Sequence, residues 1–156
     1  MDIGIAWSPT EMRGDWQINA GDLQVGSDLE TAVLVSLFTD RIADPDYVAP
    51  AGSPQERRGW WGDTYEVATG GSPIGSRLWT LNRAVRTDTR TLPARARDIC
   101  REALQWLLDS GVVASVTVTT GWVAGTSNAL AITIGIVEPS GSQTSFDYQW
   151  AWNGIS

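Results

Sequence analysis

Apolar side chains recur at every second position in three stretches near the C-terminus, which is the period of a β-strand with one buried face. The alternating residues are Val112, Ala114, Val116 and Val118, then Leu130, Ile132, Ile134 and Ile136, then Phe146, Tyr148, Trp150 and Trp152. Turn-forming residues at 121–127 and 138–142 separate the stretches, so neighbouring strands can pair through short joints. We therefore predict an antiparallel sheet of three strands over residues 112–156.

A helical period precedes this sheet. Between Thr91 and Gly111 the apolar residues lie three and four positions apart, and the charged residues fall elsewhere on the helix. The apolar stripe comprises Ala96, Ile99, Cys100, Ala103, Leu104, Leu107 and Leu108. Thr91 can cap the helix, Pro93 suits its first turn and Gly111 suits its end. The pattern predicts one long amphipathic helix that packs on the apolar face of the sheet.

Shorter elements are predicted in the first half of the chain. Ser27 and Glu30 have the spacing of a capping box, and the mostly apolar run that follows favours a helix buried on most sides. A short helix is expected over residues 76–86, and one hairpin around residues 19–22 in otherwise extended N-terminal chain. We predict an α+β fold with a single domain over residues 1–156, of which the part before the sheet, from residue 27, is mainly helical.

Residues 43–72 are rich in Pro, Gly, Asp and Ser, which predicts a long loop. Loops longer than about 15 residues inside a compact domain are usually functional or disordered. Paired guanidiniums, paired indoles and a carboxylate follow one another in this loop at Arg57, Arg58, Trp60, Trp61 and Asp63. We expect the tryptophan pair to pin the loop, either onto its own domain or onto a neighbouring protein.

A second cluster of the same kind follows at Arg77 and Trp79. Guanidiniums pair with carboxylates and stack on indole rings, and Trp and Arg are enriched at the centres of protein interfaces. We therefore predict a partner-binding site made of Arg57, Arg58, Trp60, Trp61, Asp63, Arg77 and Trp79. For Trp79, and likewise for Trp106, packing between helices is an alternative explanation that comes before any ligand.

Composition narrows the functional classes. The 156 residues suit one domain, and a domain of about 150 residues can bury a sufficient core without a disulfide or a metal. All 11 basic residues are arginine, histidine is absent, and 18 acidic residues give a net charge of -7, which disfavours a nucleic-acid partner. The single cysteine, Cys100, is expected to be a buried apolar residue. We predict no cofactor, no metal and, without an apolar run that could span a bilayer, no membrane partner.

Two other functions are open alternatives. A peptidoglycan hydrolase without histidine would have to use carboxylates such as Glu56 and Asp63, which are more simply explained as partners of the neighbouring arginines. A carbohydrate-binding, lectin-like module would stack sugar rings on tryptophan faces, including the aromatic row of residues 146–152, which core packing explains equally well. The sequence therefore predicts a protein that binds other proteins and is not an enzyme.

Four motifs resemble, in the same order, those of the baseplate proteins of Mu-like contractile-tail phages. They are Glu-Thr-Ala-Val-Leu-Val-Ser-Leu-Phe-Thr-Asp at 30–40, Asp-Pro-Asp at 44–46, Arg-Arg-Gly-Trp-Trp-Gly-Asp at 57–63 and Ile-Gly-Ser-Arg-Leu-Trp at 74–79. The resemblance covers roughly residues 20–152. It implies a structural protein of the inner wedge of the baseplate, located in the virion and assembled in the host cytoplasm. The implied partners are other wedge proteins, the tail sheath and the tube or hub.

The resemblance also implies where these contacts form. The loop at 57–63 and its neighbours Arg77 and Trp79 would bind wedge subunits, and the C-terminal strands would initiate the sheath by strand addition. In strand addition an unpaired sheet edge recruits a partner strand through main-chain hydrogen bonds. The expected edge is either the strand at 112–120 or the strand that carries Thr144, Phe146, Tyr148, Trp150 and Trp152. Residues 108–112 depart from the Glu-Pro-Arg turn of the wider sheath-initiator group.

Overall fold

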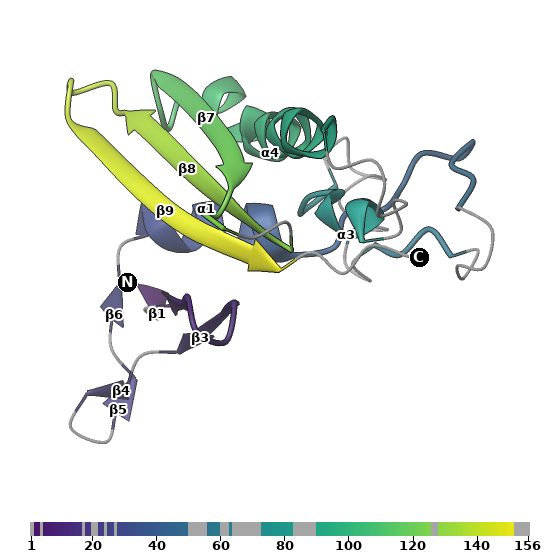
Figure 1. Ribbon diagram of the computed structural model, residues 1–156. Coiled ribbons are helices and arrows are strands. Elements are labelled where there is room, and N and C mark those ends of the chain that lie inside the picture. The colour runs from purple at the N-terminus through teal and green to yellow at the C-terminus, as the bar shows by residue number, and fades with distance from the viewer. Residues whose placement is uncertain are drawn as a thin grey trace.

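The computed structural model describes an α+β fold in which a three-stranded sheet carries one long helix on its apolar face (Figure 1). The described residues are 2–3, 5–16, 18–19, 22–23, 25–26, 28–49, 56–59, 63, 73–82, 90–125 and 128–151. In Figure 1 the short N-terminal strands lie at the lower left, near α1 and away from α4. The predicted fold class is confirmed.

The sheet comprises β7 (Ser115–Trp122), β8 (Ala129–Val137) and β9 (Gln143–Ala151), in the order β7-β8-β9. Both pairings are antiparallel, and the register places Ile134 opposite a β7 valine on one side and a β9 phenylalanine on the other. Alternate side chains of β8 are fully buried, and those between them are only partly buried. The predicted meander is therefore confirmed, and β7 and β9 are its two edge strands.

The first strand begins later than its apolar period predicted. Residues 111–114 form the turn that leads out of the long helix, and β7 starts only at Ser115. In this turn Val113 is 3% exposed and Val112 is 50% exposed, which reverses the expected alternation. The prediction that Val112 and Ala114 belong to the buried face of the strand is therefore wrong, because the chain is not yet extended at these positions.

Helix α4 (Leu92–Asp109) confirms the predicted long amphipathic helix. Its apolar stripe joins the buried residues of β8 in one hydrophobic core. Leu104 and Leu107 are fully buried there, and burial of each such side chain contributes about 1.5–3 kcal/mol. Gly111 adopts φ +73 just after the helix and lets the chain turn towards the sheet. Thr91 occupies the N-cap position, but its side chain makes no capping hydrogen bond.

Helix α1 (Asp28–Phe38) packs on the same core through Val33, Leu34 and Leu37, as its apolar run predicted. Acidic side chains in its first turn stabilise the helix by interacting with the positive end of its dipole. Ser27, the predicted capping residue, lies outside the described residues.

Among the described residues, six short strands precede α1 and form three antiparallel pairs. These are β1 (Asp2–Ile3) with β6 (Val25–Gly26), β2 (Ile5–Ser8) with β3 (Arg13–Trp16), and β4 (Ile18–Asn19) with β5 (Asp22–Leu23). The β4-β5 pair is the hairpin predicted around residues 19–22. The β2-β3 hairpin was not predicted, because its connection places a non-glycine residue, Met12, at φ +52 and so lacks the usual glycine signal.

Trp7 on β2 joins the N-terminal strands to the rest of the fold. Its ring stacks on Phe38 of α1 with centroids 4.2 Å apart, and it meets Tyr148 of β9 edge-on at 5.8 Å. Aromatic pairs in these geometries contribute about 0.5–1.5 kcal/mol beyond the area that they bury. The aromatic row of β9 thus packs inward, with Tyr148 buried in the core and Phe146 and Trp150 packed against it.

Helix α3 (Leu78–Leu81) is shorter than the helix predicted over residues 76–86. It begins later because the main chain of Ser76 is bonded to the segment that follows α1, so Arg77 becomes the N-cap residue. Residues 83–86 lie outside the described residues. The short helix nevertheless buries Leu78, Trp79 and Leu81, as its apolar positions predicted.

Candidate functional site

Three segments that are distant in sequence cross next to the C-terminal end of α1. The Arg41 N–H donates to the Ser76 carbonyl at 2.9 Å, and the Ser76 N–H donates back to the Thr39 carbonyl at 2.8 Å. The Ala43 N–H donates to the Arg57 carbonyl at 2.9 Å. Residues 56–58 and 73–79 are therefore both fixed to the segment that leaves α1.

Gly75 is required at this crossing. Its φ is +96, a conformation that residues with a side chain rarely adopt. A Cβ atom at this position would lie 2.3 Å from the Thr39 carbonyl oxygen, which belongs to the backbone and cannot swing aside. The glycine thus permits the segment around Ser76 and the segment that leaves α1 to approach within main-chain hydrogen-bonding distance.

Arg77 ties this crossing to the long helix. Its Nε and Nη2 donate to the two carboxylate oxygens of Glu102 on α4, at 2.9 and 3.1 Å, and its Nη1 donates to Asp44 at 2.8 Å. A two-pronged contact of this kind fixes both the position and the plane of the guanidinium. We call Arg57, Arg58 and Arg77, together with the groups that accept their hydrogen bonds, the arginine junction.

Arg57 and Arg58 complete the arginine junction. Arg57 donates from Nε and Nη2 to the Ala43 carbonyl, at 3.0 and 2.7 Å. Arg58 donates to Asp40 at 2.7 Å and to Glu56 at 3.4 Å, and its hydrogen bond to Asp40 is the main reason that its pKa is raised. Its backbone adopts φ +49, which is uncommon for a residue with a side chain. The two neighbouring arginines are thus held by hydrogen bonds to different acceptors, Arg57 to the Ala43 carbonyl and Arg58 to Asp40.

Trp79 lies beneath the arginine junction. Its indole N–H donates to the Arg41 carbonyl at 2.8 Å, and the Arg58 guanidinium carbon sits 5.2 Å from its ring centroid, within cation–π range. Tyr47 meets the ring edge-on at 5.6 Å. Only 4% of Trp79 is exposed, so its contacts within the chain are those of a residue that packs in the interior of the fold.

Asp63 anchors the far side of the tryptophan pair. It is 6% exposed, and its carboxylate accepts the Ile74 N–H at 2.9 Å. Trp60 and Trp61 lie outside the described residues. Arg58 and Asp63, which lie two residues before and two residues after the pair, are however both bonded to other parts of the fold.

The predicted site residues therefore fall into two groups. Arg57, Arg58, Asp63, Arg77 and Trp79 all lie in or beside the arginine junction. The predicted strand-addition residues Thr144, Phe146, Tyr148 and Trp150 lie on the inward face of β9, and Trp152 lies outside the described residues. Because strand addition uses main-chain groups, the edge is defined by the backbone of β9 and not by these side chains.

Sequence reasoning missed the acceptors of the arginine junction. Asp40 and Asp44 stand in motifs that resemble the phage family, but nothing in their spacing pairs them with Arg58 and Arg77. Glu102 lies on the polar side of an amphipathic helix, where a carboxylate is usually solvated. Only the folded chain brings these residues together, 18 to 33 positions apart in sequence.

The geometry offers little to the hydrolase alternative. The Asp63 carboxylate is covered and holds a main-chain N–H, while Glu56 is exposed and paired with Arg58. Within the described residues no group of three or more His, Cys, Asp or Glu side chains could hold a metal ion. None of the described helices is long and apolar enough to cross a membrane.

Cys100 is buried, as predicted, and forms no disulfide. Burial raises the pKa of its thiol to about 12, which keeps the thiol protonated and unreactive at neutral pH. Its surroundings are those of a small apolar core residue.

Comparisons with known proteins agree with the motifs. The model of the phage protein GP46 family matches residues 29–143. The chain is 39% identical over 159 residues to the baseplate protein gp46 of Escherichia phage Mu, covering 99% of each chain. It is 34% identical over 155 residues to the Mu-like prophage FluMu protein gp46 of Haemophilus influenzae, covering 96% of this chain and 98% of that one. The chain therefore belongs to the phage protein GP46 family, a family of Mu-like phage baseplate proteins.

Proposed function

We propose that this chain is a structural baseplate subunit that links the wedge to the tail tube and sheath and acts by binding other subunits. The relative from phage Mu is named a baseplate protein, and the two chains match over almost their whole length. The observation that carries the proposal is the anchoring of both sides of the Trp60-Trp61 pair, through Arg58 and Asp63. A segment held at both ends loses little conformational freedom when it docks.

In this proposal the arginine junction supports a docking loop. Trp79 and Arg77 are occupied within the chain, so they contribute by fixing the loop and its neighbours. The Arg58 and Asp44 side chains remain 41% and 66% exposed and can contact a wedge subunit at the rim of the interface. The tryptophan pair would form the apolar centre of that interface.

The test replaces Trp60 and Trp61 together with alanine. We expect a folded monomer with an unchanged circular dichroism spectrum that no longer enters purified baseplates. Arg97→Ala on the solvent-exposed face of α4, where the guanidinium donates to the neighbouring Asp98, serves as the control and should enter normally. If the double variant unfolds, the pair belongs to the core, and if it enters baseplates normally, the docking loop is wrong.

The edge of β9 is the second proposed contact, on which sheath strands would be added. Within the described residues β9 pairs with β8 alone. The Glu138 N–H donates to the Ser142 carbonyl at 2.9 Å in the adjoining turn, which sets the alternation of the antiparallel ladder. By this alternation Thr144 bonds to β8, and the N–H and C=O groups of Gln143, Ser145 and Asp147 point away from it.

This alternation gives a sharp test of strand addition. Ser145→Pro removes one outward N–H and leaves the bonds to β8, so it should fold normally and block sheath growth on the baseplate. Ser145→Ala keeps the N–H and is the matched control. Electron microscopy would count baseplates that carry sheath. Normal sheath growth with Ser145→Pro in place would exclude this edge, since the added strand would lose a central hydrogen bond.

A further inference from the structure

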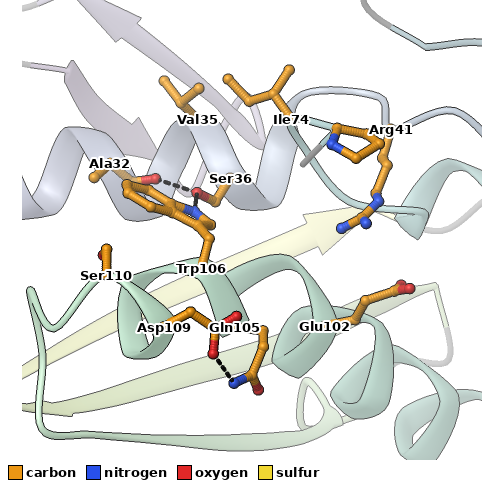
Figure 2. A pocket seen from close by; sticks show the side chains of 11 residues that line it. Ala32, Val35, Ser36, Arg41, Ile74, Glu102, Gln105, Trp106, Asp109 and Ser110 are labelled. Atoms are coloured by element: carbon orange, nitrogen blue, oxygen red, sulfur yellow. Dashed lines mark hydrogen bonds between the residues drawn. The ribbon is translucent and has the colours of Figure 1, made fainter. Parts of the chain in front are cut away.

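A groove of about 880 Å³ runs between α1 and α4 (Figure 2). Ala32, Val35 and Ser36 of α1 and Gln105, Trp106 and Asp109 of α4 line it, and Figure 2 shows the Trp106 ring reaching from α4 towards Ser36. The lining is mostly apolar, and its charged residues are Arg41, Glu102 and Asp109. The groove adjoins the supports of the docking loop, because Ile74, which bonds to Asp63, and Glu102, which bonds to Arg77, both line it.

Trp106 is held in this groove with one part of its ring open to solvent. Its indole N–H donates to the Ser36 hydroxyl oxygen at 2.9 Å, and that hydroxyl donates to the Ala32 carbonyl at 2.7 Å. Ser36 is only 2% exposed, yet Trp106 is 41% exposed, unlike the buried Trp79. The ring is therefore fixed in orientation before any partner arrives, which is the property of an interface anchor.

Charged side chains line the groove towards both ends. In Figure 2 Arg41 and Glu102 lie at one end, where Glu102 is also bonded to Arg77, and Asp109 lies beside Trp106 towards the other end. Asp109 accepts a hydrogen bond from the Gln105 amide at 3.0 Å, and neither Arg41 nor Asp109 has an ion pair among the described residues. Asp109 also stands in the last turn of α4, which has no basic residue to offset the negative end of the helix dipole.

We propose that this groove binds an amphipathic helix from another baseplate subunit. A helix fits because both walls are helices with satisfied backbones, so they offer side-chain ridges and no main-chain edge for a strand. Apolar residues spaced three and four apart would cover Trp106 and Val35. An acidic residue near its N-terminus would meet Arg41, and a basic residue near its C-terminus would meet Asp109, which is also the arrangement that the dipole of the bound helix favours.

This inference rests on the proposed baseplate role, so the experiment separates the two. A photo-crosslinking residue replaces Gln105 in the full-length chain within assembling particles, and Thr117, exposed on the opposite face of the sheet, is the control position. We expect crosslinks from position 105 to one segment of another baseplate protein that has the helical apolar period and an acidic end followed by a basic end. Crosslinks from position 117 to that segment should be absent.

Each outcome decides something. Baseplates that lack the wild-type chain would overturn the proposed function itself. Baseplates that contain the chain, but give no crosslink at position 105, or crosslinks only to a second copy of this chain or to a segment without the helical apolar period, would overturn only the groove inference.

A charge reversal completes the test. Arg41→Glu alters only the side chain, because the contacts of Arg41 described above use its backbone. We expect it to lower incorporation into baseplates at least 10-fold, while Arg97→Glu, a matched reversal outside the groove, changes it less than 2-fold; these are order-of-magnitude expectations for losing a charged interface contact. Reversal of the acidic residue in the crosslinked helix should restore incorporation. Normal incorporation of Arg41→Glu, or no rescue, would contradict the orientation proposed for the helix.

Discussion

The layer formed by α4 and β7–β9 is held by apolar side chains at regular spacing, whereas the arginine junction is held by polar bonds that share no period. In the first region Leu104, Ile132 and their neighbours exclude water and require no individual partner. In the second, each guanidinium depends on a particular oxygen, such as the Ala43 carbonyl or the Glu102 carboxylate. One region supplies stability, and the other fixes the path of a loop.

The comparison shows that arginine and tryptophan can either bind groups within their own chain or remain exposed to a partner. Arginine and tryptophan were expected at a protein interface, and here they first bind groups of their own chain. Arg58 and Trp79 form a cation–π contact inside the arginine junction. Trp106, on the long amphipathic helix α4, keeps part of its ring exposed. Whether such a residue can bind a partner therefore depends on how much of its side chain remains exposed in the folded chain.

The apolar layer should show the largest response to a single change. Leu104→Ala removes a fully buried side chain, and we expect the free energy of unfolding to fall by about 2–5 kcal/mol. Gln105→Ala, on the exposed side of the same helix, should change it by less than about 0.5 kcal/mol. Urea denaturation measures both. Equal losses at the two positions would mean that α4 does not bury one face.

The crossing of backbones should respond next most strongly. Gly75→Ala adds a Cβ that meets the Thr39 carbonyl, whereas Gly141→Ala adds one with nothing within 4 Å at nearly the same φ. The Gly141 change should therefore measure backbone strain alone, about 1–2 kcal/mol. Gly75→Ala should exceed it by about 1–3 kcal/mol because of the clash. Thermal unfolding compares them, and matching losses would disprove the close approach.

Alkaline pH should weaken the apolar layer through Cys100. The folded thiol has a pKa of about 12 and the unfolded thiol one of 9.0, so above pH 9 the unfolded state loses a proton that the folded state keeps. Stability is therefore unaffected below pH 9 and falls as pH rises, by about 1.4 kcal/mol at pH 10. Cys100→Ala should flatten this slope in urea titrations. An unchanged slope would show that the thiol is not buried.

Tyr148 contributes to the same pH dependence, because burial also raises its pKa. The variant Tyr148→Phe separates this contribution from that of Cys100.

The arginine junction should give the smallest change in stability. Arg77 and Glu102 are 30% and 37% exposed, and partly exposed ion pairs contribute about 0.2–1 kcal/mol. A double-mutant cycle with Arg77→Gln and Glu102→Gln should give a coupling in this range that shrinks at high salt. A coupling of several kcal/mol would mean that the arginine junction stabilises the fold as strongly as the apolar layer does.

The same contrast explains what the sequence could predict. The sheet, the long helix and the burial of Cys100 follow from periodic apolar residues, because burial requires a regular face. The late start of β7 and the short α3 escaped prediction, since local bonds at residues 76 and 111–114 override the period. The pairing of Arg77 with Glu102 escaped it too, because a long-range polar contact leaves no spacing signal. The groove at Trp106 needed the relative placement of two helices.

A reconstruction of the assembled tail tests the docking loop most directly. It would show whether another subunit covers the segment from Arg57 to Asp63, whose two ends this fold holds in place. We predict that a wedge protein packs against Trp60 and Trp61 there. A finished particle in which both indoles face solvent would contradict the proposed role of this segment.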